Sequence, residues 1–203
     1  MTQLLIASAS PGRLATLRRA GVEPLIQVSG VDEDLFLSTA PGMPTPAEAA
    51  LLLARAKAEA VAPAVSDVVV VGCDSVLELD GAVHGKPRDA AKAMARWRAM
   101  RGRSGVLHSG HWVVDRRTAG HHGATGAVAS TTVHFADVTD DEISAYVATG
   151  EPLHVAGGFT IDGLGGAFVE GVEGDHHNVV GLSLPLLRRL LADLGVRWTD
   201  LWS

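Results

Sequence analysis

The segment "DVVVVGCDSVLELDGAV", residues 67–83, contains an unbroken run of valines that ends in a cysteine, an acid and a serine. This run lacks the polar alternation of a half-exposed strand. Residues 67–75 therefore predict a strand that is buried on both faces of a sheet. Asp80 and Gly81 have the composition of a type I′ turn, which predicts a hairpin after the buried strand. Asp74 lies at the end of the buried run.

Strand and helix patterns intermix on both sides of this segment. Further strands are expected at residues 4–7, 25–28, 106–115 and 127–137, and helices at 11–20, 46–61, 89–100, 139–150 and 183–195. Ser10 before Pro11, and the capping-box pair Thr45 and Glu48, mark two of the helix starts. Residues 157–174 are rich in glycine around a short strand-like stretch. The pattern predicts an α/β or α+β fold with a mixed sheet.

Length, composition and charge limit the classes of function. The 203 residues suffice for one sizeable domain or for two small lobes that share a core. No apolar run reaches the length of a membrane span, and a single cysteine fits a reducing cytoplasm. The first residues lack the basic and apolar regions of a secretory signal, so none is expected. The formal net charge of −6 argues against nucleic acid and anionic membranes as partners. A small anionic ligand held by a few local cations remains compatible with this charge.

Two glycine-rich segments resemble nucleotide-binding motifs but do not match them. Residues 81–87, "GAVHGKP", are one residue too short for a phosphate-binding P-loop, and Pro87 stands where a hydroxyl should bind magnesium. Residues 163–168, "GLGGAF", lack the third glycine of a dinucleotide fingerprint and precede a strand-like run. Neither segment predicts a nucleotide site by itself.

Cysteine and histidine do not form a recognisable metal or nucleophile motif. Cys73 is expected to be a buried structural thiol. The histidine pairs 121–122 and 176–177 raise the possibility of zinc, but neither pair has the spacing of a zinc motif. Adjacent residues of an extended segment point apart, so both pairs are predicted to be solvated loop histidines. A zinc phosphatase built on these pairs is the less favoured hypothesis.

Acidic and basic side chains follow the predicted strands or begin the predicted helices. They are Asp32, Glu33 and Asp74, the cations Arg13, Lys86 and Arg103, and Glu48 and Lys57 on the helix at 46–61. Carboxylates are magnesium ligands, and lysine and arginine neutralise phosphate charge, so this set suits a magnesium–polyphosphate substrate. Each residue alone also fits a structural role: Glu48 in a capping box, Lys57 on a solvated helix face, Asp74 in a turn.

Four blocks of the sequence resemble the Maf family of nucleoside triphosphate pyrophosphatases, in the family's order. The first contains "SASPGR" and "VDE", the second "PAEAALLLARAKA", the third "CDSV" with "GKP", and the last "YVATGEP" with "NVVGL"; they span residues 4–34, 46–58, 68–94 and 143–184. The likeness covers nearly the whole chain.

This resemblance implies a Maf/ITPase-like two-lobed α/β fold with a mixed central β-sheet and a cleft between the lobes, residues 1–203 forming one domain. It also implies a cytoplasmic homodimer that hydrolyses (d)NTPs, modified nucleotides included, to nucleoside monophosphate and diphosphate. The implied cofactor is a divalent cation, Mg²⁺ or Mn²⁺. The alternative is a nucleotide-binding regulator of cell division with little or no turnover.

The resemblance also assigns roles to individual residues. The implied catalytic residues are Asp74 as proton acceptor, Lys57 and Lys86; the substrate-binding residues are Ser8, Ser10, Gly12, Arg13, Ser75 and Asp162; the metal ligands are Glu33 and Asp74. Serine hydroxyls, an arginine and free N–H groups at a helix start attract an anion, which agrees with a phosphate loop at residues 8–13.

Five positions depart from the family pattern. Gly12 replaces an arginine, Ser75 stands where the dTTP- and UTP-preferring branch has threonine, and Asp162 stands where that branch has glutamine. Asp162 substitutes an acceptor-only carboxylate for an amide that both donates and accepts. A dTTP preference is therefore not transferred to this chain. Ser183 and Gly105 replace a proline and a histidine.

Overall fold

The computed structural model describes residues 2–39, 42–120 and 122–203. Its strands are β1 (Gln3–Ile6), β2 (Leu25–Ile26), β3 (Val68–Leu79), β4 (Ala82–His84), β5 (Ser104–Asp115), β6 (Ala124–Phe135) and β7 (Val169–Glu173). Its α-helices are α1 (Pro11–Arg19), α2 (Glu33–Ser38), α3 (Pro46–Val61), α4 (Ala90–Met100), α5 (Asp140–Ala148), α6 (His176–Val180) and α7 (Leu184–Asp193). Short 3₁₀ turns are η1 (Ala62–Ala64), η2 (Glu151–His154), η3 (Ala156–Gly158), η4 (Leu164–Phe168) and η5 (Trp198–Leu201).

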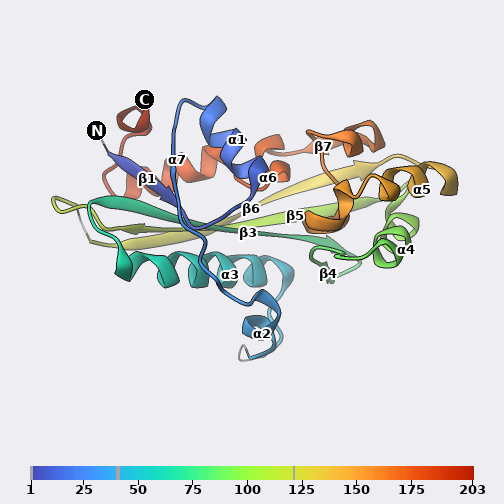
Figure 1. Ribbon diagram of the computed structural model, residues 1–203, viewed down its shortest axis with the longest axis horizontal. Helices are drawn as coiled ribbons and strands as arrows, with labels where there is room; N and C mark the ends of the chain where they lie inside the picture. Colours follow the sequence, from blue (N-terminus) through green and yellow to red (C-terminus); the bar gives the residue numbers. More distant parts are fainter. Residues whose placement is uncertain (1, 40–41, 121) are drawn as a thin grey trace.

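The strands form one mixed sheet in the order β2-β1-β3-β5-β6-β7, with β4 added to the far end of β3. β1 is parallel to β2 and β3, whereas β5, β6 and β7 continue antiparallel. Helix α3 covers one face of the sheet, and α1, α6 and α7 lie on the other (Figure 1). The predicted α/β class with a mixed central sheet is confirmed. Within the described residues, no helix combines the length and the apolar character needed to cross a membrane.

Strand β3 is buried on both faces, as its valine run predicts. Val69, Val71 and Cys73 belong to the core beneath α1 and α7. Val68 and Val70 belong to the opposite core with α3. The hairpin is also confirmed: β4 pairs antiparallel with the end of β3, and both turn residues, 80 and 81, have positive φ angles of 53° and 76°, as a type I′ turn requires.

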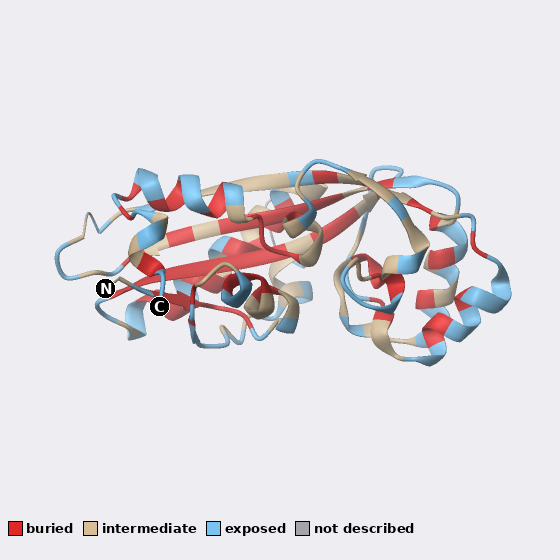
Figure 2. Cartoon of the chain, turned by 90° about the horizontal axis from the view of Figure 1, so that it is seen from above, coloured by how far each residue is buried: buried red, intermediate tan, exposed pale blue. Residues whose placement is uncertain are grey.

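A second group of elements covers the far ends of the long strands. Its core contains Trp97 of α4, Tyr146 of α5 and Phe135 of β6, whose rings meet edge to face at centroid distances of 5.5–5.8 Å. Figure 2 shows this smaller group beside the larger body, joined to it by the shared sheet. The prediction that residues 1–203 act as one domain stays a prediction.

Two helices were not predicted, and several boundaries differ. Helices α2 and α6 span six and five residues, too few for a hydrophobic period, and each begins at an aspartate N-cap, Asp32 and Asp175. The strand expected at 25–28 is only two residues long. The glycine-rich segment forms η3 and η4 before β7 begins at Val169. The predicted starts of α1, α3, α5 and α7 agree with their observed caps.

The backbone of α3 lies directly against the sheet at two glycines. A Cβ atom on Gly72 would come within 2.1 Å of the Ala54 carbonyl oxygen, and one on Gly110 within 2.2 Å of the Ala50 carbonyl oxygen. The two glycines lie on neighbouring strands, β3 and β5. Only glycine leaves room for this approach, which holds α3 against the strand that carries Asp74.

A gap in the edge of β3 locates the site. β1 pairs with residues 68–71 of β3 and β4 with residues 77–79, so the described strands leave residues 72–76 open on that edge. Successive side chains of a strand point to opposite faces. Asp74, like Gly72, therefore points toward α3, whereas Ser75 points toward α1. The open edge thus receives side chains from both layers of helices.

We expect Gly72→Ala to lower the free energy of unfolding by about 3 kcal/mol or more, because the new methyl group meets helix backbone that cannot rotate away. Urea unfolding of the two proteins measures this. Gly85→Ala is the matched control, since a Cβ there meets no atom within 4 Å. Equal losses in the two variants would show that α3 does not rest on Gly72.

His111 is a buried neutral histidine that joins β5 to the start of α7. Its Nε2 accepts the Ser183 N–H at 2.9 Å, so its Nδ1 carries the proton and donates to the Ser109 carbonyl oxygen at 3.0 Å. Burial lowers the pKa of His111 to about 4, although the hydrogen bond to Ser109 opposes this shift; the positive charge of Arg13 adds to it.

The lowered pKa of His111 predicts a loss of stability in mild acid. The unfolded chain binds a proton near pH 6.5, whereas the folded chain does not until about pH 4, so the free energy of unfolding falls as pH drops through this window. The full contribution is about 3 kcal/mol. Denaturant unfolding between pH 7.5 and 4.5 measures it. His111→Gln should flatten the slope and the surface variant His134→Gln should not; equal slopes in all three proteins would contradict the assignment.

Candidate functional site

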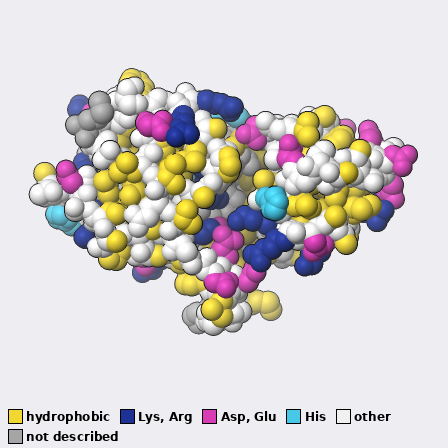
Figure 3. Space-filling view, viewed as in Figure 1, with side chains coloured by type: hydrophobic (Ala, Val, Ile, Leu, Met, Phe, Trp, Pro, Cys, Tyr) yellow, Lys and Arg dark blue, Asp and Glu magenta, His cyan; other side chains and the backbone are white. Residues whose placement is uncertain are grey.

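A cavity of about 950 Å³ opens at the gap in the edge of β3. Its lining includes every residue to which the resemblance assigns a role: Ser8, Ser10, Gly12, Arg13, Glu33, Lys57, Asp74, Ser75, Lys86 and Asp162. These residues come from the β1–α1 connection, the first turn of α1, α2, α3, β3, the segment after β4 and the segment after η3. In Figure 3, cationic and acidic side chains gather where the surface is hollowed between the two groups of elements. Residues far apart in the sequence thus meet in one site.

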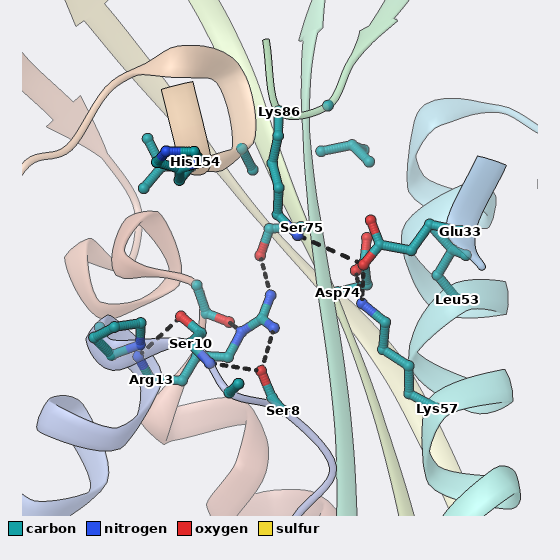
Figure 4. A pocket seen from close by; sticks show the side chains of 18 of the residues that line it. Ser8, Ser10, Arg13, Glu33, Leu53, Lys57, Asp74, Ser75, Lys86 and His154 are labelled. Atoms are coloured by element: carbon teal, nitrogen blue, oxygen red, sulfur yellow. Dashed lines mark hydrogen bonds and ion pairs between the residues drawn. The ribbon is translucent and has the colours of Figure 1, made fainter. Parts of the chain in front are cut away.

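Lys57 lies between two carboxylates at the centre of the cavity wall (Figure 4). Its Nζ donates to Glu33 Oε1 at 2.6 Å and makes a short hydrogen bond to Asp74 Oδ1. Lys57 and Asp74 are only 7% and 5% exposed. The close seating of α3 on the sheet supplies the lysine, and helix α2 supplies the glutamate. The structural alternative for Lys57, a lysine on a solvated helix face, is therefore wrong.

The two carboxyl groups differ in their proton affinity. Burial raises the pKa of Asp74 above its ordinary value, although Lys57 and Arg13 oppose this shift. Glu33 is less deeply buried. Burial also acts to raise its pKa, but the nearby Lys57 and Lys86 ammonium groups outweigh burial and lower it. Asp74 is therefore the better proton acceptor, and Glu33 the more firmly ionised group.

Arg13 is held by three acceptors on the opposite side of the cavity. Its Nε donates to the Gly181 carbonyl oxygen at 2.8 Å, its Nη1 to Ser8 Oγ and its Nη2 to Ser75 Oγ, both at 3.1 Å. The side chain is buried. These contacts fix the plane of the guanidinium group, which therefore needs little reorganisation to bind an anion.

The N-terminus of α1 borders the same wall. Ser10 caps this nine-residue helix, and its Oγ accepts the Arg13 N–H at 3.5 Å, as the sequence predicts. Gly12 faces Val180 of α6: a Cβ at position 12 would come within 3.0 Å of Val180 Cγ1. A larger residue at position 12 would have to displace α6 slightly, so glycine suits this packing.

A hydroxyl relay behind Arg13 was missed by the sequence analysis. Ser75 Oγ lies 2.7 Å from Ser109 Oγ, and Ser109 donates to the Asn178 carbonyl oxygen at 3.2 Å, so Ser75 donates to Ser109. The Asn178 amide donates to Leu107, Ala129 and Thr131. No motif marks Ser109, which sits inside β5; Asn178, within "NVVGL", was the available signal.

The remaining charged residues of the predicted constellation divide into two groups. Lys86 lies at the cavity mouth, 44% exposed in its side chain, with Nζ 3.6 Å from Glu33 Oε1. Arg103 does not line the cavity; it pairs with Asp80 at the tip of the hairpin. Asp32 caps α2 by accepting the Leu35 N–H at 3.0 Å and is likewise absent from the lining. Grouping Arg103 and Asp32 with the phosphate-binding residues was therefore wrong. Glu48 forms the predicted capping box.

The members of the two histidine pairs that the structure describes, His122, His176 and His177, do not line this cavity. His121 lies outside the described residues. His176 and His177 begin α6, and their ring centroids are 3.8 Å apart, so the prediction that they point apart in an extended segment is wrong. His154, by contrast, does line the cavity. Cys73 is buried, and burial raises the pKa of its thiol to about 11, which makes it unreactive as predicted.

Comparisons with known proteins agree across the chain. A family model described as "Maf-like protein" matches residues 3–194. A Streptomyces coelicolor protein named nucleoside triphosphate pyrophosphatase is 59% identical over 99% of this chain and 95% of its own length. A Salinispora tropica protein of the same name is 61% identical over 99% of this chain and 88% of its own length.

Among solved structures, a nucleoside-triphosphatase (dITP/XTP pyrophosphatase) from Mycobacterium abscessus is similar at 19% identity and a TM-score of 0.36, over 68% of this chain and 76% of that one. A likeness this distant says nothing about the site. The family model and the two close relatives span nearly the whole chain. The chain therefore belongs to the Maf-like protein family.

Proposed function

We propose that this chain is a nucleoside triphosphate pyrophosphatase, which converts a nucleoside triphosphate to the monophosphate and pyrophosphate. The observation that carries the proposal is the convergence of three cations, Arg13, Lys57 and Lys86, and two acids, Glu33 and Asp74, on one cavity. Such a set balances the charge of a triphosphate with a bound divalent cation. Close relatives that bear this name support the same activity.

The triphosphate would lie along the wall formed by the β1–α1 connection. Pro11 has no N–H and Ser10 caps the Arg13 N–H, so the Gly12 N–H is the group at this helix start that can face an anion at the positive end of the helix dipole. The Ser8 and Ser10 hydroxyls and the Arg13 guanidinium border the same wall. Pro11 at the first helical position has no N–H to lose, so helix capping and phosphate binding are compatible there.

Glu33 and Asp74 fit a hard divalent cation such as Mg²⁺ or Mn²⁺. Their Oε1 and Oδ1 atoms already converge on a single ammonium group, that of Lys57, so both oxygens are directed at a shared point. Oxygen donors of this kind are the ligands these cations prefer. When bound, the cation would neutralise charge on the phosphates. Lys57 would then share its two carboxylates with the cation, and metal dependence is part of this proposal.

Asp74 would accept the proton of the attacking water. Asp74 lines the cavity, so its carboxylate can reach a water there, although a cation bound to the same carboxylate would act to lower its pKa. The water oxygen forms a bond to the α-phosphorus, and the bond from that phosphorus to the bridging oxygen of the β-phosphate breaks. The electron pair leaves with pyrophosphate. Lys86, exposed at the cavity mouth, stabilises the charge that develops there.

The homodimer and the cytoplasmic location implied by the resemblance stay predictions. The alternative, a nucleotide-binding regulator with little turnover, would use the same cavity. The two functions differ only in whether the bound nucleotide is cleaved, so one assay separates them.

The Asp74→Asn variant is expected to lose at least about 100-fold in turnover, because the amide cannot accept the proton. Pyrophosphate and monophosphate release from a panel of standard and modified triphosphates, with Mg²⁺ or Mn²⁺ and after chelation, measures this. Activity should require one of the two cations. Asp193→Asn, which replaces an exposed carboxylate on α7, is the matched control.

Circular dichroism shows whether Asp74→Asn keeps its fold. Undiminished turnover in that variant would exclude Asp74 as the proton acceptor. Tight nucleotide binding by the unmodified protein without any product, across the whole panel, would replace the enzyme with the regulator.

A further inference from the structure

The segment after η3, residues 160–165, wraps around a single carboxylate, that of Glu151. Glu151 Oε1 accepts hydrogen bonds from the Tyr146 hydroxyl at 2.9 Å, the Thr160 hydroxyl at 2.5 Å and the Gly165 N–H at 3.0 Å. Its Oε2 accepts the Leu164 N–H at 3.0 Å. Three of these four donors belong to the wrapped segment. The carboxylate therefore acts as the anchor of that segment.

Two glycines allow the backbone to close around the carboxylate. A Cβ on Gly163 would come within 2.8 Å of Glu151 Oε2, and one on Gly165 within 2.5 Å of the Tyr146 hydroxyl oxygen. Burial alone would raise the pKa of Glu151, but the hydrogen bonds from Thr160, Leu164 and Gly165 hold it below its ordinary value. Glu151 is thus ionised and satisfied by donors from the segment it holds.

The anchored segment forms one wall of the proposed substrate cavity. Thr160 and Asp162 line the cavity, together with Phe159 and His154 from the neighbouring turns. In Figure 4, His154 lies above Ser75 and beside Lys86, whereas Ser8, Ser10 and Arg13 lie below Ser75, so this wall is distinct from the phosphate-binding wall.

The charge of this wall indicates which part of a nucleotide it faces. Asp162 adds a carboxylate to it, and the Glu151 carboxylate lies directly behind. Negative charge disfavours phosphate oxygens, whereas carboxylate and hydroxyl oxygens accept the N–H and O–H groups of a base or a sugar. The triphosphate and the nucleoside part are thereby directed to opposite walls.

We propose that Glu151 is a positioning residue: its carboxylate holds residues 160–165 in place, so that Thr160 and Asp162 present a fixed surface to the nucleoside part of the substrate. This inference rests on the proposed function. Glu151 does not reach the cavity lining itself. It therefore acts on nucleotide affinity and not on cleavage of the phosphate bond.

Glu151→Gln tests the proposal with little change in volume. The amide has one acceptor oxygen, and its NH₂ group would face donors, so at least one of the backbone N–H groups loses its partner. The affinity for nucleoside triphosphates is expected to weaken about 10-fold or more, seen as a raised KM, with kcat within about threefold. Inorganic tripolyphosphate, which has no nucleoside part, should inhibit the variant as well as it inhibits the unmodified protein.

Glu151→Asp, which keeps the charge, should restore part of the nucleotide affinity. Glu142→Gln is the matched control, because Glu142 also accepts a backbone N–H but does so at the start of α5, away from the cavity. Amide hydrogen exchange in residues 159–166 gives a second readout: exchange should accelerate in Glu151→Gln and not in Glu142→Gln.

The outcomes distinguish this inference from the proposed function. A loss in kcat with unchanged KM, an equal loss of tripolyphosphate inhibition, or unchanged exchange at Leu164 and Gly165 would overturn the positioning role. Absence of turnover in the unmodified protein would instead refute the pyrophosphatase. Calorimetric binding of a non-hydrolysable triphosphate then replaces KM, and a weakened affinity in Glu151→Gln would still support the anchor.

Discussion

The Lys57 ammonium, buried between Glu33 and Asp74, is the contact on which the arrangement of the site depends. A buried charge is tolerable only when it is paired, and removal of one partner leaves the other uncompensated. The contact also ties three separate elements together, since the lysine comes from α3, one acid from α2 and the other from β3. Helix α3 reaches β3 because Gly72 admits its backbone. The position of the site is therefore a consequence of how closely helix α3 packs against the sheet.

The cavity has two chemically different walls. On one side, Arg13 is fixed by Ser8, Ser75 and a backbone carbonyl, next to the start of α1. On the other, the segment anchored by Glu151 presents hydroxyl and carboxylate groups. The triphosphate of a nucleotide binds to cations, whereas its nucleoside part binds to hydrogen-bond acceptors and apolar groups. A site with this polarity orients a nucleotide before any chemistry occurs.

Much of the fold follows from local sequence. The valine run of β3, the capping box of α3 and the hairpin at Asp80 each have a short-range physical cause, and the structure confirms them. Helices α2 and α6 could not be predicted from periodicity, because five or six residues do not complete two turns. Their aspartate caps were present in the sequence, but such caps also occur in turns.

The site was only partly predictable. Asp74, Lys57 and Arg13 each have a plausible structural role when taken singly. Their positions in the sequence suggested a shared polyphosphate site, the family resemblance made it specific, and tertiary packing brings them to one cavity. Ser109 carries no motif of its own, and Glu151 lies within the "YVATGEP" block without a role assigned to it; their importance comes from contacts that form only in the folded chain. Arg103 resembled the site cations in its local sequence, yet its guanidinium group pairs with Asp80 at the tip of the β3–β4 hairpin.

A double-mutant cycle between Lys57→Met and Asp74→Asn tests the central contact most directly. Urea unfolding of the unmodified protein, the two single variants and the double variant gives the coupling free energy. Lys57→Met leaves the buried Asp74 carboxylate without its ammonium partner, and Asp74→Asn leaves Lys57 with Glu33 alone, whereas the double change removes both charges of the Lys57–Asp74 pair. The coupling free energy is therefore expected to reach about 2 kcal/mol or more. The double variant should lose less stability than the sum of the losses in the two single variants. Additive losses would contradict the account, because they would show that Lys57 and Asp74 do not depend on each other.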